Sequence, residues 1–203
     1  MREKILAAAI QVISERGVVA ATTKEIARAA GVSEGSLYNH FPSKTALFGA
    51  AIATVAGSIR EAMFELLGSV GKNTVEDNLT RLAAAAVRFY GELLPMTGPA
   101  LGDPGLLAWL RSGGPAAEGS EAARLGGPVT GHVTLIGYLE AEQAAGRISA
   151  ELKAPYLAAA LLGACQQTAF LTKLAGADAV AEGARLPADP EEFARDLVRT
   201  LLH

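Results

Sequence analysis

The sequence predicts an all-α protein in which a long helix joins a small amino-terminal three-helix domain to a larger helical domain. Half of the 203 residues are hydrophobic, 5% are aromatic, and 41 are alanine, the residue with the highest helix propensity. Apolar residues recur at intervals of three and four, and no stretch of any length alternates as a strand would. We therefore expect two helical domains, over 1–50 and 51–203.

The first fifty residues are expected to form three helices, over 2–16, 22–30 and 34–41. Gly17 lies where the first helix should be capped. Thr22 and Glu25 have the spacing of a capping box, in which side chain and backbone satisfy each other at a helix start. Gly31 suits a tight turn, and Ser33 suits the cap of the third helix.

Longer helices are expected in the rest of the chain. One begins near Ser43 and runs to about residue 70, crossing the domain boundary, because its apolar residues follow steps of three and four. Asp189 and Pro190 predict the start of the last helix, as a cap followed by an N1 proline. Residues 176–188 are expected to be loose. The other helices are expected over 74–94, 106–111, 129–145 and 155–174.

Two short helices joined by a glycine-containing turn, with a bracing helix before them, are typical of a helix-turn-helix. In that motif one helix lies in the DNA major groove while its neighbour crosses the backbone. Ile26, Ala27 and Ala30 supply small apolar contacts between the pair. Residues 1–50 hold six Lys/Arg and four Asp/Glu, a net of +2, whereas residues 51–203 hold twelve and seventeen, a net of −5. This asymmetry fits an amino-terminal module that meets a polyanion.

The residues of this segment also follow a specific pattern: Thr23-x-x-Ile26-Ala27-x-x-Ala30-Gly31-Val32-Ser33-x-Gly35-x-Leu37-Tyr38-x-His40-Phe41-x-Ser43-Lys44-x-x-Leu47. In this pattern the chain resembles the DNA-binding signature of the TetR family of bacterial transcriptional regulators. The stretch 138–148 is more weakly similar to a segment of many members. The DNA-binding residues that follow from the resemblance and from the exposed helix faces are Thr23, Lys24, Ser33, Glu34, Gly35, Ser36, Tyr38, Asn39, His40 and Lys44.

The resemblance implies two kinds of contact within this set. Thr23, Tyr38, His40 and Lys44 are expected to bind phosphates, and the exposed residues of the third helix are expected to read base edges. Tyr38 and His40 have a second interpretation, as packing between helices. Glu34 either accepts a hydrogen bond from cytosine or only favours the helix dipole.

A short recognition helix reads few bases, so we expect a homodimer that reads a palindrome. The helix at 155–174 is apolar on two sides, and a helix of that kind is covered by its own core and by a partner. The residues predicted for the dimer interface are Leu157, Leu161, Ala164, Thr168, Leu171, Phe193, Leu197 and Leu201.

The resemblance also implies a small-molecule cavity in the larger domain. A mostly apolar set of side chains with a few polar groups suits an apolar or amphipathic effector. Ordinary core or surface packing is the alternative at every one of these positions. The candidate ligand residues are Phe64, Leu67, Phe89, Met96, Trp109, Tyr138, Gln166, Gln167 and Phe170.

These features predict a ligand-responsive, sequence-specific DNA-binding regulator, with a repressor released from its operator by an effector as the first interpretation. Two alternatives stay open: an activator or co-repressor-dependent regulator, and a ligand- or partner-binding module that has lost DNA binding. No familiar catalytic or nucleotide-binding motif is present, and the histidines lack metal-ligand spacing, so we expect neither an enzyme nor a cofactor.

The sequence predicts a cytoplasmic protein that does not span a membrane. A lone cysteine, Cys165, excludes an intrachain disulfide and suits a reducing compartment. Residues 154–172 carry no charge, but Pro155 and the polar run at 166–168 interrupt them, so a buried helix is expected there.

Overall fold

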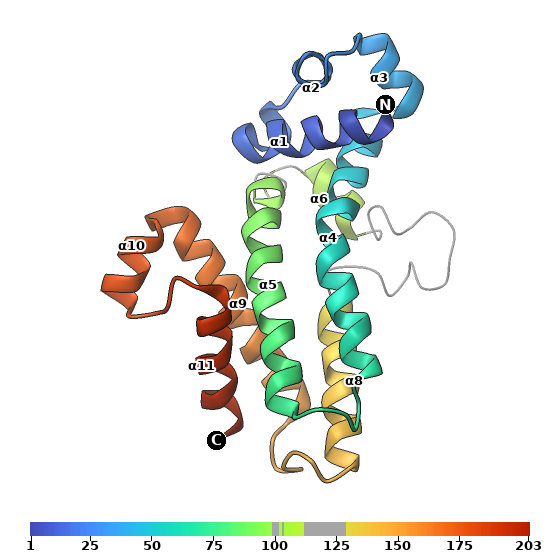
Figure 1. Ribbon diagram of the computed structural model, residues 1–203. Helices are drawn as coiled ribbons and strands as arrows, with labels where there is room; N and C mark the ends of the chain where they lie inside the picture. Colours follow the sequence, from blue (N-terminus) through green and yellow to red (C-terminus); the bar gives the residue numbers. More distant parts are fainter. Residues whose placement is uncertain (99–101, 103, 112–128) are drawn as a thin grey trace. The chain divides into compact units, whose positions relative to one another are not determined.

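The computed structural model describes residues 1–98, 102, 104–111 and 129–203, and the described residues form helices and no strand (Figure 1). The predicted all-α class is confirmed. The longer helices are α1 (Arg2–Ala20), α2 (Thr23–Ala30), α3 (Glu34–His40), α4 (Lys44–Gly68), α5 (Val75–Thr97), α6 (Pro104–Arg111), α8 (Thr130–Ala144), α9 (Ala154–Ala175) and α11 (Pro190–Leu202).

Contacts along the chain divide it into two compact units. The first unit holds Met1–Ala56 and Glu92–Pro128, and the second holds Gly57–Gly91 and Val129–His203. α4 is continuous across the division at residue 56, so one helix contributes to both units. A boundary near residue 50, drawn from sequence, remains our proposal for where the amino-terminal domain ends.

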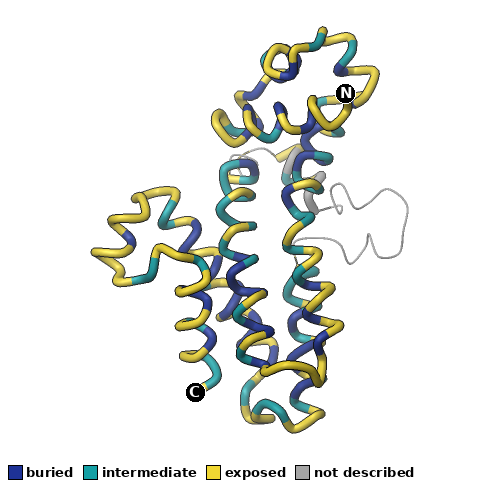
Figure 2. Tube along the Cα trace, viewed as in Figure 1, coloured by how far each residue is buried: buried dark blue, intermediate teal, exposed yellow. Residues whose placement is uncertain are grey.

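The first unit is built on α1, α2 and α3, whose apolar faces pack together. Gly17 interrupts α1 at φ 77° and ψ 156°, a conformation that glycine adopts without a Cβ penalty, and the helix then resumes to Ala20. The glycine therefore lies at the predicted break, although the helix extends beyond it. The side chains buried in this core include Ile5, Ala9, Ile13, Ile26, Ala27, Leu37, Phe41, Leu47 and Phe48 (Figure 2).

The second unit has a larger apolar core, in which α9 packs against both α8 and α11. Full burial of one large aliphatic side chain contributes about 1.5–3 kcal/mol, so this cluster dominates the stability of the unit. Its largest members are Met63, Leu66, Leu79, Leu82, Leu135, Tyr138, Leu139, Leu157, Leu161, Leu162 and Phe193.

Two segments differ from the expectation. Residues 176–188 were predicted to be loose, but they contain α10 (Ala177–Ala179) and a π-helical turn (Val180–Ala184), because buried Val180 anchors them. α5 continues past the expected end near residue 94 to Thr97, with Pro95 inside it.

α4 is long and apolar enough, by length and composition alone, to cross a membrane. The same test is passed by core helices of soluble proteins, and six hydrophobic side chains of α4 are buried within the units: Leu47, Phe48, Ala51, Val55, Met63 and Leu66. The membrane criterion is therefore weak evidence here.

Candidate nucleic-acid interface

The start of α2 is fixed by a reciprocal cap and by an ion pair with α1. The Glu25 backbone amide donates to Thr22 Oγ1 at 3.2 Å, and the Thr22 amide donates to Glu25 Oε2 at 3.2 Å. Arg16 Nη1 lies 2.8 Å from Glu25 Oε1. The hydrogen bonds from the Thr22 side chain and backbone, with help from Arg16, lower the pKa of Glu25. The predicted capping box is confirmed, and it fixes where α2 begins relative to α1.

The turn between α2 and α3 needs its glycine. Gly31 has φ 64°, in the left-handed region, and its amide donates to the Arg28 carbonyl at 3.0 Å. Ser33 then caps α3, since its Oγ accepts from the Ser36 amide at 3.1 Å. Leu37 is buried on one side of α3, which leaves the other side of that helix open.

The ten predicted DNA-binding residues all lie at the surface of this unit. Thr23, Ser36 and Lys44 are half-buried, and Tyr38 is 45% exposed. The remaining six are exposed: Lys24, Ser33, Glu34, Gly35, Asn39 and His40. None of the ten residues is buried in the core, so the surface of α3 and the start of α2 offer hydrogen-bond donors and acceptors to a ligand.

Three of these residues contact one another. Thr23 Oγ1 donates to Glu34 Oε1 at 2.6 Å, and Thr23 Oγ1 lies 3.3 Å from the Tyr38 hydroxyl. The structure therefore brings the first residue of α2 together with two residues of α3. We call this set the hydroxyl–carboxylate cluster (Thr23, Glu34 and Tyr38).

Lys44 lies at the start of α4 and has an internal partner. Its Nζ donates to the carbonyl of Val19 at 3.3 Å, which ties α4 to the end of α1. Arg2 lies over the ring of buried Phe41, 4.9 Å from its centre, and holds the amino terminus against the end of α3. Both cations are thus held on the unit that carries α3.

Comparison with known proteins identifies this segment. Residues 5–51 match the family described as "Bacterial regulatory proteins, tetR family". The amino-terminal domain of this chain is a TetR-family domain. The match covers all of α2 and α3 and the start of α4, so it contains the whole hydroxyl–carboxylate cluster.

Solved structures show that the fold is similar to that of known regulators. A protein of Rhodococcus sp. whose crystal structure is assigned to the TetR family is 19% identical, with a TM-score of 0.68, and the match covers 100% of this chain and 98% of that one. The regulator FadR of Bacillus subtilis, solved with stearoyl-CoA, is 20% identical, with a TM-score of 0.61 over 100% and 98% of the two chains. The whole described fold is therefore that of TetR-family regulators.

The nucleoid occlusion factor SlmA of Haemophilus ducreyi is 36% identical over 76 residues, or 37% of this chain. That match spans only 34% of SlmA, about a third of its length. The matched proteins are regulators and a nucleoid occlusion factor, which agrees with the expectation that this TetR-like chain is not an enzyme.

The candidate ligand residues are scattered over different environments. Phe64, Leu67, Gln166, Gln167 and Phe170 are exposed, Phe89 is half-buried, and Met96 and Tyr138 are buried, whereas the side chain of Trp109 lies outside the described residues. Their role in binding an effector stays a prediction.

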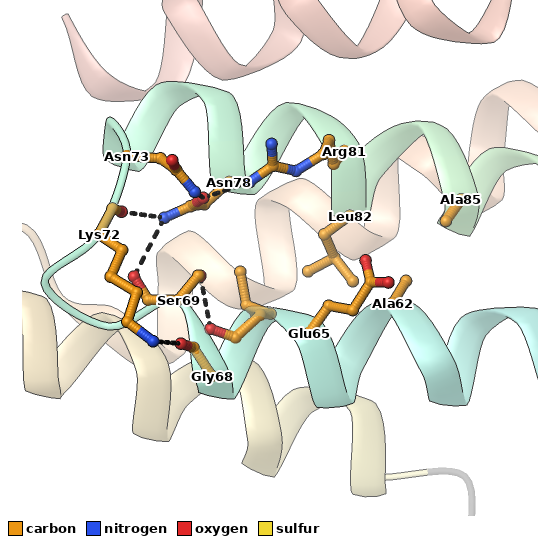
Figure 3. Close-up of a pocket in the computed structure, with 11 residues that line it drawn as sticks. Ala62, Glu65, Gly68, Ser69, Lys72, Asn73, Asn78, Arg81, Leu82 and Ala85 are labelled. Carbon is orange, nitrogen blue, oxygen red and sulfur yellow. Dashed lines mark hydrogen bonds between the residues drawn. The ribbon is translucent and has the colours of Figure 1, made fainter.

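The second unit does contain a hollow of about 480 Å³ between the end of α4 and the first half of α5 (Figure 3). Both cationic side chains in its lining have partners: Lys72 Nζ donates to the Gly68 carbonyl at 2.9 Å, and Arg81 donates to Asn78 Oδ1 at 2.6 Å. The hollow is lined by Ala62, Glu65, Leu66, Gly68, Ser69, Lys72, Asn73, Asn78, Arg81, Leu82 and Ala85.

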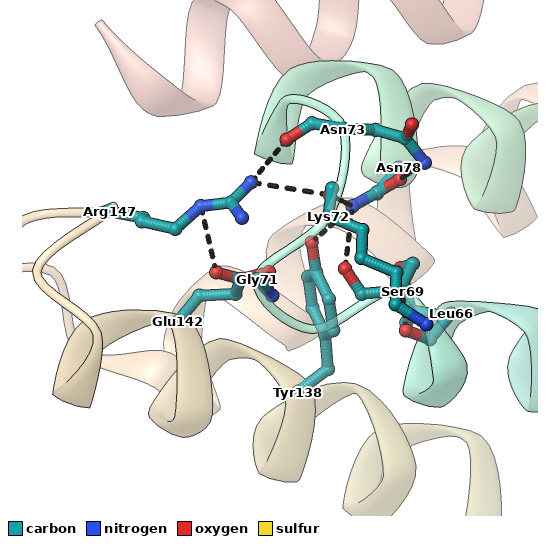
Figure 4. Close-up of polar contacts among 9 residues, drawn as sticks. All are labelled: Leu66, Ser69, Gly71, Lys72, Asn73, Asn78, Tyr138, Glu142 and Arg147. Carbon is teal, nitrogen blue, oxygen red and sulfur yellow. Dashed lines mark hydrogen bonds and ion pairs between the residues drawn. The ribbon is translucent and has the colours of Figure 1, made fainter.

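A buried polar network lies beside this hollow and joins α8 to the turn between α4 and α5 (Figure 4). Asn78 Nδ2 donates to the Tyr138 hydroxyl at 3.0 Å and to the Lys72 carbonyl at 2.9 Å. Burial raises the pKa of Tyr138 to about 12, and the Glu142 carboxylate adds to that rise. Tyr138 thus has a structural partner of its own, which sequence analysis did not foresee.

Glu142 completes the network. Its side chain is fully buried, Oε1 accepts from the Gly71 amide at 3.2 Å, and Oε2 lies 3.2 Å from Arg147 Nε. Arg147 also donates to the carbonyls of Lys72 and Asn73. A glutamate four residues after Tyr138 on a mostly apolar helix was the sequence signal for this site.

The predicted dimer residues lie partly in the core of the second unit. Leu157, Leu161, Thr168 and Phe193 are buried within the chain, and Ala164, Leu171, Leu197 and Leu201 are half-buried. A different stripe of α9 is exposed along its whole length, at Tyr156, Ala160, Gly163, Gln167, Phe170 and Leu174.

Proposed function

We propose that this chain is a ligand-responsive, sequence-specific DNA-binding transcriptional regulator of the bacterial cytoplasm. The observation that carries the proposal is the exposed face of α3 in a TetR-family domain. The exposed side chains Asn39 and His40 are polar, and they lie on a helix whose other face holds buried Leu37.

In this proposal α3 enters the major groove and α2 braces it across the backbone. Ser33 to Ser36 and Asn39 meet base edges, because hydroxyl, carboxylate and amide groups read the donor and acceptor pattern of that groove. Thr23, Tyr38, His40 and Lys44 meet the flanking phosphates, and Lys24 adds positive charge at the start of α2.

We propose that the regulator is a homodimer formed through α9 and α11. The exposed stripe of α9 follows steps of three and four, which puts its six residues on one face. Small residues at Ala160 and Gly163 let a second helix approach closely, while Phe170, at 50% exposure, and Leu174, at 72%, supply apolar surface. The half-buried residues of the sequence-predicted set extend this face, and its four buried residues support it from the core.

The effector is proposed to be an apolar or amphipathic small molecule that binds the second unit and releases the protein from its operator. α4 supports this coupling because it is one continuous helix with residues in both units. The effector must bind the DNA-incompetent state more tightly, since equal affinity for both states shifts no population. Stearoyl-CoA, which FadR of Bacillus subtilis binds, is a practical first probe of the amphipathic class.

Similarity to SlmA of Haemophilus ducreyi favours a second candidate, a DNA-binding factor that acts at many chromosomal sites rather than at one promoter. Chromatin immunoprecipitation with the full chain separates the two candidates. A regulator gives peaks at one or a few promoters, whereas a nucleoid-associated factor gives peaks dispersed along the chromosome.

A mobility-shift assay on the region upstream of the chain's own gene tests the proposed function. We expect a discrete shift with the wild-type protein and none with Asn39→Ala, because Asn39 is exposed on α3 and makes no core contact. Transcription from the same region, measured with and without the protein, then separates a repressor from an activator. The proposal fails if the folded wild-type protein shifts neither this region nor any selected duplex.

A further inference from the structure

The hydroxyl–carboxylate cluster raises a question about proton donors. A phosphate oxygen only accepts hydrogen bonds, so a threonine or tyrosine hydroxyl grips a phosphate by donating its single proton. Thr23 and Tyr38 are the two hydroxyls proposed for that task. Both lie within hydrogen-bonding distance of other groups in the free protein, at 2.6 Å and 3.3 Å.

The two protons can be assigned from the chemistry of the groups. Glu34, when ionised, only accepts, so Thr23 Oγ1 must be the donor in the 2.6 Å contact. Thr23 then has no second proton to give, and the Tyr38 hydroxyl must be the donor in the 3.3 Å contact. Both protons therefore point into the cluster rather than outward to a phosphate.

We infer that Glu34 is a specificity-determining residue that keeps the Thr23 hydroxyl proton from the DNA backbone until a base binds the Glu34 carboxylate instead. The inference rests on the proposed DNA-binding function. Glu34 already accepts the one proton that Thr23 Oγ1 could donate to a phosphate, and the negative charge of Glu34 also repels the DNA backbone.

The release has a chemical trigger in the major groove. The N4 amino group of cytosine donates hydrogen bonds there, and carboxylates are its usual side-chain acceptors. When Glu34 turns to that amino group, Thr23 Oγ1 recovers its proton for a phosphate. At a site without a suitably placed amino group the Glu34 carboxylate stays bound to Thr23, so the protein binds the DNA phosphates more weakly. Base identity is thereby coupled to phosphate binding.

The test compares two duplexes of equal length and composition, one carrying a sequence selected by the wild-type protein and one scrambled. Affinities of the full chain are measured by fluorescence anisotropy over a salt series. We expect Glu34→Ala, which removes the acceptor for Thr23 Oγ1, to tighten binding to the scrambled duplex by about threefold or more. We also expect it to steepen the salt dependence by about one charge per protomer. The preference for the selected duplex should fall correspondingly.

Two controls separate the positioning role from a general charge effect. Glu61→Ala removes the same charge from an exposed position of α4 in the second unit and should leave both affinities unchanged. In a Thr23→Val background the Glu34→Ala gain should largely disappear, because no hydroxyl remains to be released.

The outcomes distinguish this inference from the proposed function. If the wild type prefers the selected duplex but Glu34→Ala leaves scrambled binding unchanged or weaker, the inference is overturned and the function stands. An equal gain in the Thr23→Val background also overturns it, since Glu34 would then act by charge alone. If folded wild type and Glu34→Ala bind no duplex, the proposed function fails and takes this inference with it.

Discussion

At the residue scale, Gly35 is a helical glycine that the packing of the fold does not require. It lies inside α3, where glycine costs about 0.5–1 kcal/mol relative to alanine. A Cβ added there would meet nothing closer than Ser33 Oγ at 3.9 Å, an ordinary contact distance. The fold therefore does not require a glycine at this position, and we propose that the glycine allows DNA to approach the α3 backbone closely.

The expected result for Gly35→Ala is a protein that is as stable as the wild type or more stable by up to about 1 kcal/mol, with weaker operator binding. Urea unfolding and anisotropy titration measure the two quantities. Gly57→Ala on α4, where a Cβ also meets nothing within 4 Å, is the matched control and should retain binding. Operator affinity equal to that of the wild type in Gly35→Ala would refute the close-approach explanation.

Cys165 and Tyr138, two buried groups of the second unit that ionise by losing a proton, limit the stability of the protein at high pH. Burial raises the pKa of Cys165 from 9.0 to about 12 and that of Tyr138 from 10.0 to about 12. Both groups lose protons earlier in the unfolded chain than in the folded one, so the unfolded state binds fewer protons above pH 9. Stability is therefore complete below about pH 9 and falls as the pH rises toward 12.

We predict that Cys165→Ala reduces this alkaline loss, because the thiol no longer contributes to it. Urea unfolding of the wild type and the variant at several pH values between 8 and about 11 gives the comparison. Below pH 9 the variant is expected to be less stable, since it removes a buried atom that packs near the Ala83 carbonyl. Parallel pH profiles for the two proteins would contradict the prediction.

At the scale of the element, the cap at the start of α2 helps to hold the helix-turn-helix in place. Thr22→Ala removes the acceptor for the Glu25 amide and is expected to cost about 1 kcal/mol. Thr200→Ala in α11 is the control, because its hydroxyl bonds only within the helix, to the Asp196 carbonyl. Thermal unfolding measures both variants, and equal stability of the two would show that the cap is not needed.

The exposed stripe of α9 is the proposed dimer face. Phe170→Glu puts a charge into the proposed dimer face and should convert the dimer to monomers at micromolar concentration. Val133→Glu on α8, where the side chain is also about half exposed, is the control and should remain dimeric. Sedimentation velocity measures the outcome, and a dimeric Phe170→Glu variant would exclude this stripe as the interface.

Local chemistry made the elements predictable from sequence. Caps and turns, such as Thr22 with Glu25 and Gly31, specify their own positions because every partner lies within a few residues. The contact between Thr23 and Glu34 depends on the angle between two helices, and no short-range pattern encodes that angle. The network of Asn78, Tyr138 and Glu142 joins residues about sixty apart in sequence, so it required the tertiary structure.

The faces of α9 illustrate the same difference. Its periodic apolar residues predicted a helix apolar on two sides, but periodicity alone does not say which side meets the chain's own core. The structure puts Leu157 and Leu161 in that core and leaves Tyr156 and Phe170 exposed. Packing of α8 and α11 against α9 decides the matter, and that packing is a property of the whole unit.

At the scale of the whole molecule, the central claim is that two copies of the chain read a palindrome through α3. Each copy contributes one recognition helix, and two such helices must be one helical turn of DNA apart, about 34–36 Å, to enter successive major grooves. Neither copy alone offers enough base contacts for a specific site, so dimerisation through α9 and reading by α3 are parts of one activity.

Selection of bound sequences from a random duplex pool, repeated with Tyr38→Ala, tests this claim most directly. Tyr38 is 45% exposed and outside the buried core, so the variant should fold and dimerise. We predict that the wild type enriches a palindrome of about 15–20 base pairs, with half-sites about one turn apart, and that the variant enriches none. A folded, dimeric wild-type protein that enriches no sequence, or a variant that enriches the same palindrome, would contradict the account.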